Sequence, residues 1–131
     1  MVFDASSLVG ATILPDSIPR RAFQKACDTE DIALSLAVWN ELVEVLNRPR
    51  LARYVRPALR EDVLTNLIDV AVWVAPMQRV TDCRDAKDNK YLELALASAA
   101  TRIVASDNDL LVLDPWRGIR ILRPADYLVA G

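Results

Sequence analysis

The chain has 131 residues, of which 53% are hydrophobic and 26% are charged, and its formal net charge at pH 7 is −2. This length predicts one domain over residues 1–131, long enough to bury a core, and the composition is typical of a folded soluble protein. The longest apolar run, residues 70–76, is far shorter than the roughly 18 residues of a membrane span. No basic segment precedes an apolar stretch at the amino terminus, so we expect a cytoplasmic protein without a membrane segment.

The composition also excludes several kinds of chemistry. Histidine is absent, which removes Ser-His-Asp and Cys-His catalysis and most zinc sites. Only three glycines occur, too few for a P-loop or a dinucleotide-binding fingerprint. The two cysteines, Cys27 and Cys83, lack metal-ligand spacing and are expected to be ordinary thiols. A slightly negative chain has no global attraction to nucleic acid, so any such binding requires a local basic patch.

Hydrophobic periods typical of strands and of helices alternate along the chain. Strands are predicted at residues 1–3, 32–36, 102–105 and 119–122. Helices or helical turns are predicted at residues 18–27, 37–46, 50–55, 57–74, 88–100, 108–113 and 124–128. Prolines support this division, because three stand in first turns and Pro49 ends the helix 37–46. The alternation predicts an α/β fold, a three-layer α/β/α sandwich with a mainly parallel central sheet.

Four acidic residues stand where an apolar segment ends or on the border of a helix's buried face: Asp4, Glu41, Asp88 and Asp107. Asp4 directly follows the first strand, and Asp107 follows the third strand with only Ser106 between. In a parallel sheet these two acids emerge at the same carboxyl edge, where open α/β folds place their sites. A carboxylate at the edge of a core is costly without a cation, and no Lys or Arg lies at a fixed spacing from each acid. The pattern therefore predicts a site for a hard divalent cation.

Some of these acids also have a purely structural interpretation. Asp4 could be a turn residue whose carboxylate caps nearby amides. Asp107 could equally cap the helical turn that begins after it, and its neighbour Asp109 could be solvated or an accessory ligand. Asp85 and Asp88 both stand at the start of one helix, where a single cap is enough. We assign Asp85 the capping or supporting role and Asp88 the role of ligand.

Asp88 and Glu41 are the acids that a structural role explains least. Glu41 borders the buried face of its helix, whereas Glu44 points well away from it and has the position expected of a surface glutamate. Asp88 shares a helical face with apolar residues that are expected to be buried, Leu92, Ala95 and Ala99. One metal-binding cluster explains all four positions better than four separate caps.

The segments around these acids resemble the successive motifs of PIN-domain proteins. The resembling segments are residues 2–9, 40–49, 84–95 and 106–111, followed by 119–128, and together they span nearly the whole chain. More narrowly, these segments are similar to a bacterial group of PIN-domain toxins from toxin–antitoxin pairs, the relatives of VapC. The resemblance implies metal binding by Asp4, Glu41, Asp88 and Asp107, with Asp109 as an occasional extra ligand. Two departures are Ala5-Ser6, where the family often has Thr-Asn, and Ser106, where it commonly has glycine.

The resemblance implies a Mg²⁺- or Mn²⁺-dependent endoribonuclease. Because histidine is absent, activation of water at neutral pH is expected to fall to the metal, and the products would carry a 5′-phosphate and a 3′-hydroxyl. Basic residues that flank the acids could hold the RNA backbone, although a solvated face explains each of them as well: Arg48, Arg50, Arg53, Lys87 and Lys90.

The resemblance further implies a homodimer and a cognate antitoxin protein. The helix predicted over residues 57–74 is apolar on more than one face and could form either interface, or could belong to the core. Two functional alternatives stay open, namely a catalytically inactive PIN-fold binding module and a nuclease that cleaves DNA. A phosphoacceptor receiver domain is disfavoured, because neither its paired acid near the first strand nor its late lysine is clearly present.

Overall fold

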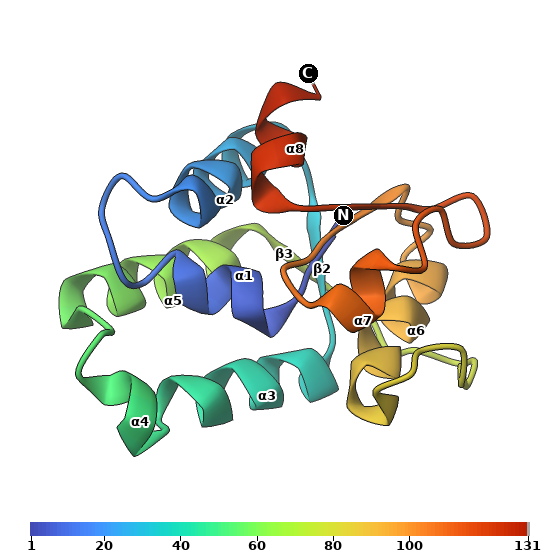
Figure 1. Ribbon diagram of the computed structural model, residues 1–131, viewed down its shortest axis with the longest axis horizontal. Helices are drawn as coiled ribbons and strands as arrows, with labels where there is room; N and C mark the ends of the chain where they lie inside the picture. The colour runs from blue at the N-terminus through green and yellow to red at the C-terminus, as the bar shows by residue number, and fades with distance from the viewer. Residues whose placement is uncertain (131) are drawn as a thin grey trace.

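The computed structural model describes residues 1–130, and its centre is a set of short parallel strands (Figure 1). One sheet has the order β1-β4-β5, formed by Val2–Phe3, Arg102–Val104 and Arg120–Leu122. A second sheet pairs β2 (Ile32–Leu34) with β3 (Ala71–Trp73). All of these pairings are parallel. The Ala33 N–H donates to the Met1 carbonyl at 2.8 Å, so β2 lies beside β1 and joins the two sheets.

The helices cover both faces of these strands, which confirms the predicted α/β/α sandwich. The Phe3 ring of β1 packs edge-on against Phe23 and Tyr127, and α6 lies against β1, β2 and β4. No helix within residues 1–130 is long and apolar enough to cross a membrane. The helices are α1 (Ala5–Gly10), α2 (Ile18–Thr29), α3 (Leu36–Leu46), α4 (Pro49–Ala52), α5 (Pro57–Val70), the 3₁₀ helix η1 (Ala86–Asp88), α6 (Asn89–Ala97), α7 (Asn108–Leu111) and α8 (Pro124–Val129).

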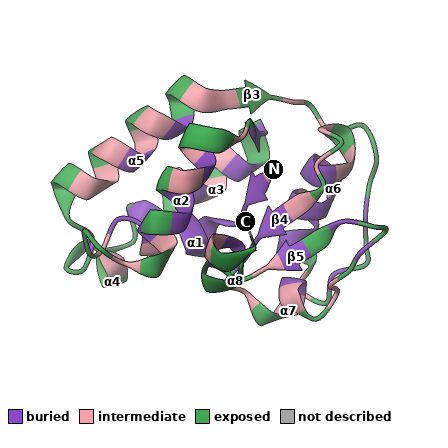
Figure 2. Cartoon of the chain, turned by 90° about the horizontal axis from the view of Figure 1, so that it is seen from above, coloured by how far each residue is buried: buried purple, intermediate pink, exposed green. Residues whose placement is uncertain are grey.

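The buried residues form one core between these layers (Figure 2). Its largest fully buried side chains include Phe3, Phe23, Tyr91 and Tyr127. The short strands are buried because helices cover them on both faces, as is usual for parallel sheets. Strand β3 is the most exposed of the described strands, with Val72 and Trp73 both open to solvent.

The structure shortens two of the predicted helices and adds one helix that was not predicted. The helix predicted over 57–74 ends at Val70, because residues 71–73 leave it to pair with β2 as β3. The helix predicted over 88–100 ends at Ala97, where Ala99 has a positive φ of 55° and the Ala100 N–H donates back to the Ala95 carbonyl at 2.9 Å. Helix α1, directly after Asp4, was not predicted.

The register of the parallel strands sets the position of the candidate site. Phe3 of β1 pairs with Val104 of β4, and the Asp4 N–H donates to the Val104 carbonyl at 2.9 Å. The chain leaves both strands at the same edge of the sheet, as predicted. Residues that follow β1 and β4 therefore meet there, although about 100 residues separate them in the sequence.

Candidate metal centre

A cavity of about 130 Å³ opens at the carboxyl edge of the sheet, and acidic side chains line it. They come from four parts of the chain: the end of β1, helix α3, the turn η1 and the start of α7. The structure places all four predicted acids in this lining and adds a fifth. The five are Asp4, Glu41, Asp85, Asp88 and Asp107.

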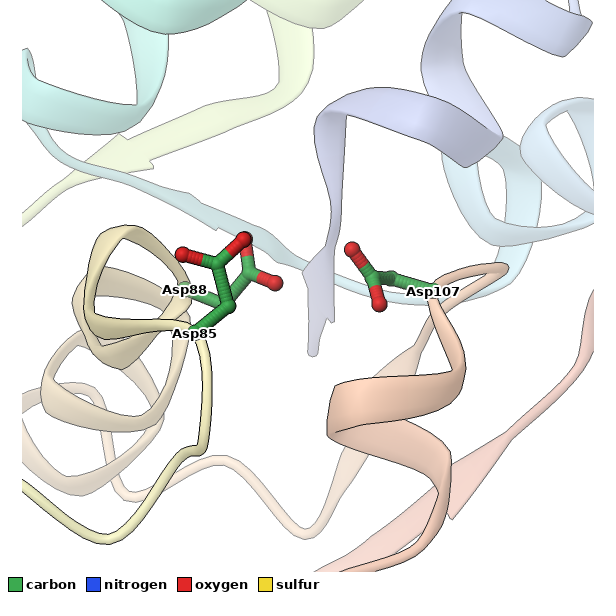
Figure 3. Close-up of side chains that lie close together, drawn as sticks. All are labelled: Asp85, Asp88 and Asp107. Atoms are coloured by element: carbon green, nitrogen blue, oxygen red, sulfur yellow. The ribbon is translucent and has the colours of Figure 1, made fainter.

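Asp85, Asp88 and Asp107 form the tightest group in the cavity. Each offers one carboxylate oxygen, and these oxygens all lie within 4.8 Å of one another. Asp85 and Asp88 project from one segment, and Asp107 faces them from the start of α7 (Figure 3). Three oxygens so close together match the ligands that a hard divalent cation prefers.

Asp88 is the member of this group whose surroundings best fit a cation. The residue is only 7% exposed, and its Oδ2 is buried without a hydrogen-bond partner among residues 1–130. It does not cap α6, although it stands at the N-cap position. Burial, together with the neighbouring Asp107 carboxylate, raises the pKa of Asp88 to about 7. A buried carboxylate oxygen without a donor is costly, and a bound cation would satisfy it.

Asp85 has the capping role that the sequence predicted, but it also belongs to the acidic group. Its Oδ1 accepts the Lys87 N–H at 3.1 Å, and the Lys87 ammonium lies 3.8 Å from Oδ2. The sequence therefore predicted the capping role of Asp85 but not its place among the three clustered carboxylates. The three-residue spacing of Asp85 and Asp88 was the available signal, because one turn of 3₁₀ helix brings residues i and i+3 onto the same side.

Asp107 also combines two roles. It is the N-cap of α7, and its Oδ1 accepts the Asp109 N–H at 2.9 Å. Asp109, predicted as an occasional extra ligand, lies outside the lining of the cavity. The contact of Asp109 with Asp107 is made by its backbone N–H rather than by its carboxylate.

Asp4 is 2% exposed, and backbone amides from two segments hold its carboxylate. Oδ1 accepts the Ser7 N–H at 2.8 Å, while Oδ2 accepts the N–H groups of Ser106 at 3.0 Å and Asp107 at 3.3 Å. Burial raises the pKa of Asp4, and these amides act in the opposite direction. Asp4 thus caps α1, as its structural interpretation predicted, and also fixes the segment that carries Asp107.

Glu41 has a cationic partner, contrary to the expectation that no cation neutralises these acids. Its Oε2 accepts from the Lys90 ammonium at 2.5 Å, and its Oε1 accepts from the Tyr91 hydroxyl. The Tyr91 oxygen in turn accepts the Ala5 N–H at 3.0 Å. Burial and the Glu41 carboxylate raise the pKa of Tyr91, which keeps its hydroxyl a donor. Lys90 and Tyr91 therefore set the position of Glu41. Sequence reasoning named Lys90 only as a possible contact to the RNA backbone and did not name Tyr91, because both lie far from Glu41 along the chain.

Comparison with known proteins identifies the family. Residues 1–109 match the family model of the PIN domain. The chain belongs to the PIN-domain family. An uncharacterized protein of the archaeon Methanocaldococcus jannaschii is similar to it, with 28% identity over 115 residues that span 86% of this chain and 74% of the relative. Membership in the PIN family indicates a nuclease, and the acidic group is suited to binding a metal ion.

The two departures from the common PIN pattern have different consequences. Ser6, in place of the usual Asn, lies exposed in the lining of the cavity. Ser106, in place of the usual glycine, donates its N–H to Asp4, and its hydroxyl lies 2.8 Å from that of Ser7. The contact between the two hydroxyls ties the residue after β4 to α1, so the Ser106 side chain adds a link that glycine could not make.

Proposed function

We propose that this PIN domain is a Mg²⁺- or Mn²⁺-dependent endoribonuclease that hydrolyses RNA phosphodiester bonds, and the toxin of a type II toxin–antitoxin pair. The observation that carries the proposal is the buried, unpartnered Oδ2 of Asp88 beside the carboxylates of Asp85 and Asp107. Of residues 1–130, only these three acids bring their carboxylate oxygens together in this way. The sequence resemblance to VapC-like toxins supplies the choice of RNA and the toxin role.

In this proposal, Asp88 and Asp107 hold the metal directly, with Asp85 as a third ligand, and Asp4 and Glu41 complete the site. When bound, a divalent cation lowers the pKa of its water and offsets charge on the scissile phosphate. The residues themselves orient the reactants. Asp4 keeps Asp107 in place through the amide contacts of its Oδ2, and Tyr91 with Lys90 aims the Glu41 carboxylate into the cavity. Glu41 is then placed to accept a hydrogen bond from the attacking water.

Two other functions follow from specific features of the chain. A catalytically inactive PIN module would have no need of a buried carboxylate without a donor, so Asp88 argues against it. A nuclease acting on DNA would use the same phosphodiester chemistry, and no motif in the sequence reads the 2′-hydroxyl. RNA is therefore the first substrate to test, with DNA of the same sequence beside it.

A homodimer and a cognate antitoxin belong to the same proposal. The sequence left open whether the apolar residues of helix α5 belong to the core or to an interface, and the helix has residues of both kinds. Leu67 is fully buried in the core, whereas Ile68 is 51% exposed. Val72 and Trp73 of β3, the strand that follows α5, are exposed as well. Light scattering should give a mass of about twice 14.6 kDa, and Ile68→Asp should lower it if this surface is the dimer interface.

The test of the proposed activity is cleavage of labelled single-stranded RNA by the purified protein. We expect cleavage with Mg²⁺ or Mn²⁺, none with EDTA, and products that carry a 5′-phosphate. Asp107→Asn should abolish cleavage, while Asp69→Asn, an exposed acid outside the metal centre, should leave it unchanged. Cleavage that persists in EDTA would contradict the proposed metal dependence. Preferential cleavage of the matched DNA would show that DNA, and not RNA, is the substrate.

A further inference from the structure

A second hollow, of about 330 Å³, lies next to the metal centre on the side of α6. Its charged lining consists of Arg79, Lys87, Lys90 and Glu93. Lys87 also lines the metal cavity, so the two spaces are neighbours across one side chain. Three cations beside one acid make this hollow locally basic, in a chain whose net charge is −2.

The cations of this hollow differ in whether a carboxylate of the protein already pairs with them. Lys90 is bound to Glu41, as described above. Arg79 is exposed and makes no ion pair with any residue that the structure describes. The Lys87 side chain is 73% exposed, and within residues 1–130 the carboxylate that forms an ion pair with it is that of Asp85, at 3.8 Å. Arg79 and Lys87 are therefore available to an anion from outside the chain.

The acid of the hollow and the loop beside it are fixed by backbone contacts. The Glu93 Oε2 accepts the Val80 N–H at 2.9 Å, so this carboxylate holds the loop that carries Arg79. The Cys83 N–H donates to Asn89 Oδ1 at 2.8 Å, which ties the same loop to the start of α6. The two contacts hold the loop that carries Arg79 against α6, so that Arg79 and Lys87 both line one hollow.

We propose that this hollow is a subsite for the nucleic-acid backbone, which binds a phosphate adjacent to the scissile one through Arg79 and Lys87. This inference rests on the proposed nuclease function and names how the same site holds its substrate. The five carboxylates of the metal cavity repel a polyanion, and the neighbouring cations offset that repulsion at the point where the strand must pass. A single strand is the ligand that fits, because its flexible backbone can follow two adjoining hollows.

The first test measures binding without cleavage. A fluorescent single-stranded RNA of about ten nucleotides, and DNA of the same sequence, would be titrated with the protein in EDTA and followed by anisotropy. Arg79→Ala should weaken binding about three- to fivefold at low salt and reduce the slope of log K against log salt by about 1. Lys87→Ala should act in the same direction, and Arg79→Lys should keep most of the affinity because it keeps the charge.

The matched control is Arg21→Ala, which removes an exposed arginine of α2 that also lacks an ion pair within the described chain. We expect its binding to equal that of the parent. Equal losses for Arg21→Ala and Arg79→Ala would show general charge attraction and would overturn the subsite. Equal effects on RNA and DNA are expected, because the subsite contacts phosphate; losses confined to RNA would also overturn it.

A second measurement locates the phosphate. In a series of oligonucleotides, one phosphate at a time is replaced by a neutral methylphosphonate. One position should weaken binding to the parent and have a smaller effect on Arg79→Ala, since the substitution has already removed one of the two contacts to that phosphate. If the parent cleaves RNA and Arg79→Ala binds as the parent does, the subsite is wrong and the proposed function stands. If these binding effects appear and the parent never cleaves, the proposed function is wrong, and the hollow is a phosphate-binding site of a protein that binds nucleic acid without cleaving it.

Discussion

Both edges of the sheet carry acidic residues, but the surroundings of these acids differ between the two edges. At the amino edge, the acids lie around the ends of α2 and α5: Asp28, Glu30, Asp31 and Asp69. Three of them are exposed to solvent. The fourth, Glu30, is half-buried, but Arg102 donates to it at 2.7 Å and the Tyr127 hydroxyl donates to its other oxygen. Every acid at this edge is therefore solvated or neutralised by the protein itself.

At the carboxyl edge, burial is not matched by cations. Asp4 is held by backbone amides, and Asp88 has an oxygen with no donor among residues 1–130. Of the five acids, Glu41 pairs with Lys90 at 2.5 Å and Asp85 with the exposed Lys87 at 3.8 Å, while Asp4, Asp88 and Asp107 have no ion pair within residues 1–130. The comparison shows that the number of acids does not mark the site, since both edges are acidic. What distinguishes the carboxyl edge is the desolvation of carboxylates that the protein leaves without a cation.

The largest expected effect separates two glutamates one turn apart on α3. Glu41 lines the metal centre, whereas Glu44 resembles the acids of the amino edge, because it is exposed and paired with Arg48 at 2.8 Å. Glu41→Gln should lower the rate of RNA cleavage by about 100-fold or more, and Glu44→Gln should keep most of it. Initial rates at saturating Mn²⁺ measure both. Similar rates in the two variants would place Glu41 outside the catalytic site.

The next effect concerns the neutralised acid of the amino edge. Arg102→Ala leaves the half-buried Glu30 without its guanidinium partner, so the free energy of unfolding should fall by about 1–2 kcal/mol. Arg21→Ala, which removes an exposed arginine without an ion pair, should have little effect. Urea unfolding curves compare the two. An Arg102→Ala protein as stable as the parent would mean that solvent, and not the ion pair, compensates the charge of Glu30.

A smaller effect of opposite sign is expected at the carboxyl edge. Asp88→Asn removes an uncompensated charge, so it should stabilise the metal-free protein by about 1 kcal/mol at pH 8. The pKa of Asp88 is about 7 in the folded protein and 3.8 as the ordinary value. The folded state therefore binds the proton more tightly, and the stability of the parent should fall as pH rises through about 7.

Melting curves in EDTA at pH 6 and pH 8 test this prediction. The parent should lose stability between the two values relative to Asp88→Asn, and the gain from the substitution should shrink at pH 6, where Asp88 is already protonated. A gain that is the same at both values would mean that the charge of Asp88 is compensated in the folded protein.

Sequence reasoning located this edge because its signals are local. The ends of two apolar strands predicted Asp4 and Asp107, and helical phase predicted that Asp88 and Glu41 face the interior. The pairing of Glu41 with Lys90 joins residues 49 positions apart, so no local pattern could reveal it. Strand β3 was missed because residues 71–73 continue the apolar pattern of α5, and only their pairing with β2 makes them a strand.

The most direct test of the account is Mn²⁺ binding, measured as the shift in melting temperature that the ion causes. A ligand at 100 times its dissociation constant adds about 2.7 kcal/mol to the stability of the state that binds it. We predict a clear upshift for the parent, nearly the same upshift for Asp69→Asn at the amino edge, and a much smaller one for Asp88→Asn. An unchanged upshift in Asp88→Asn would contradict the account, because the buried carboxylate would then hold no metal.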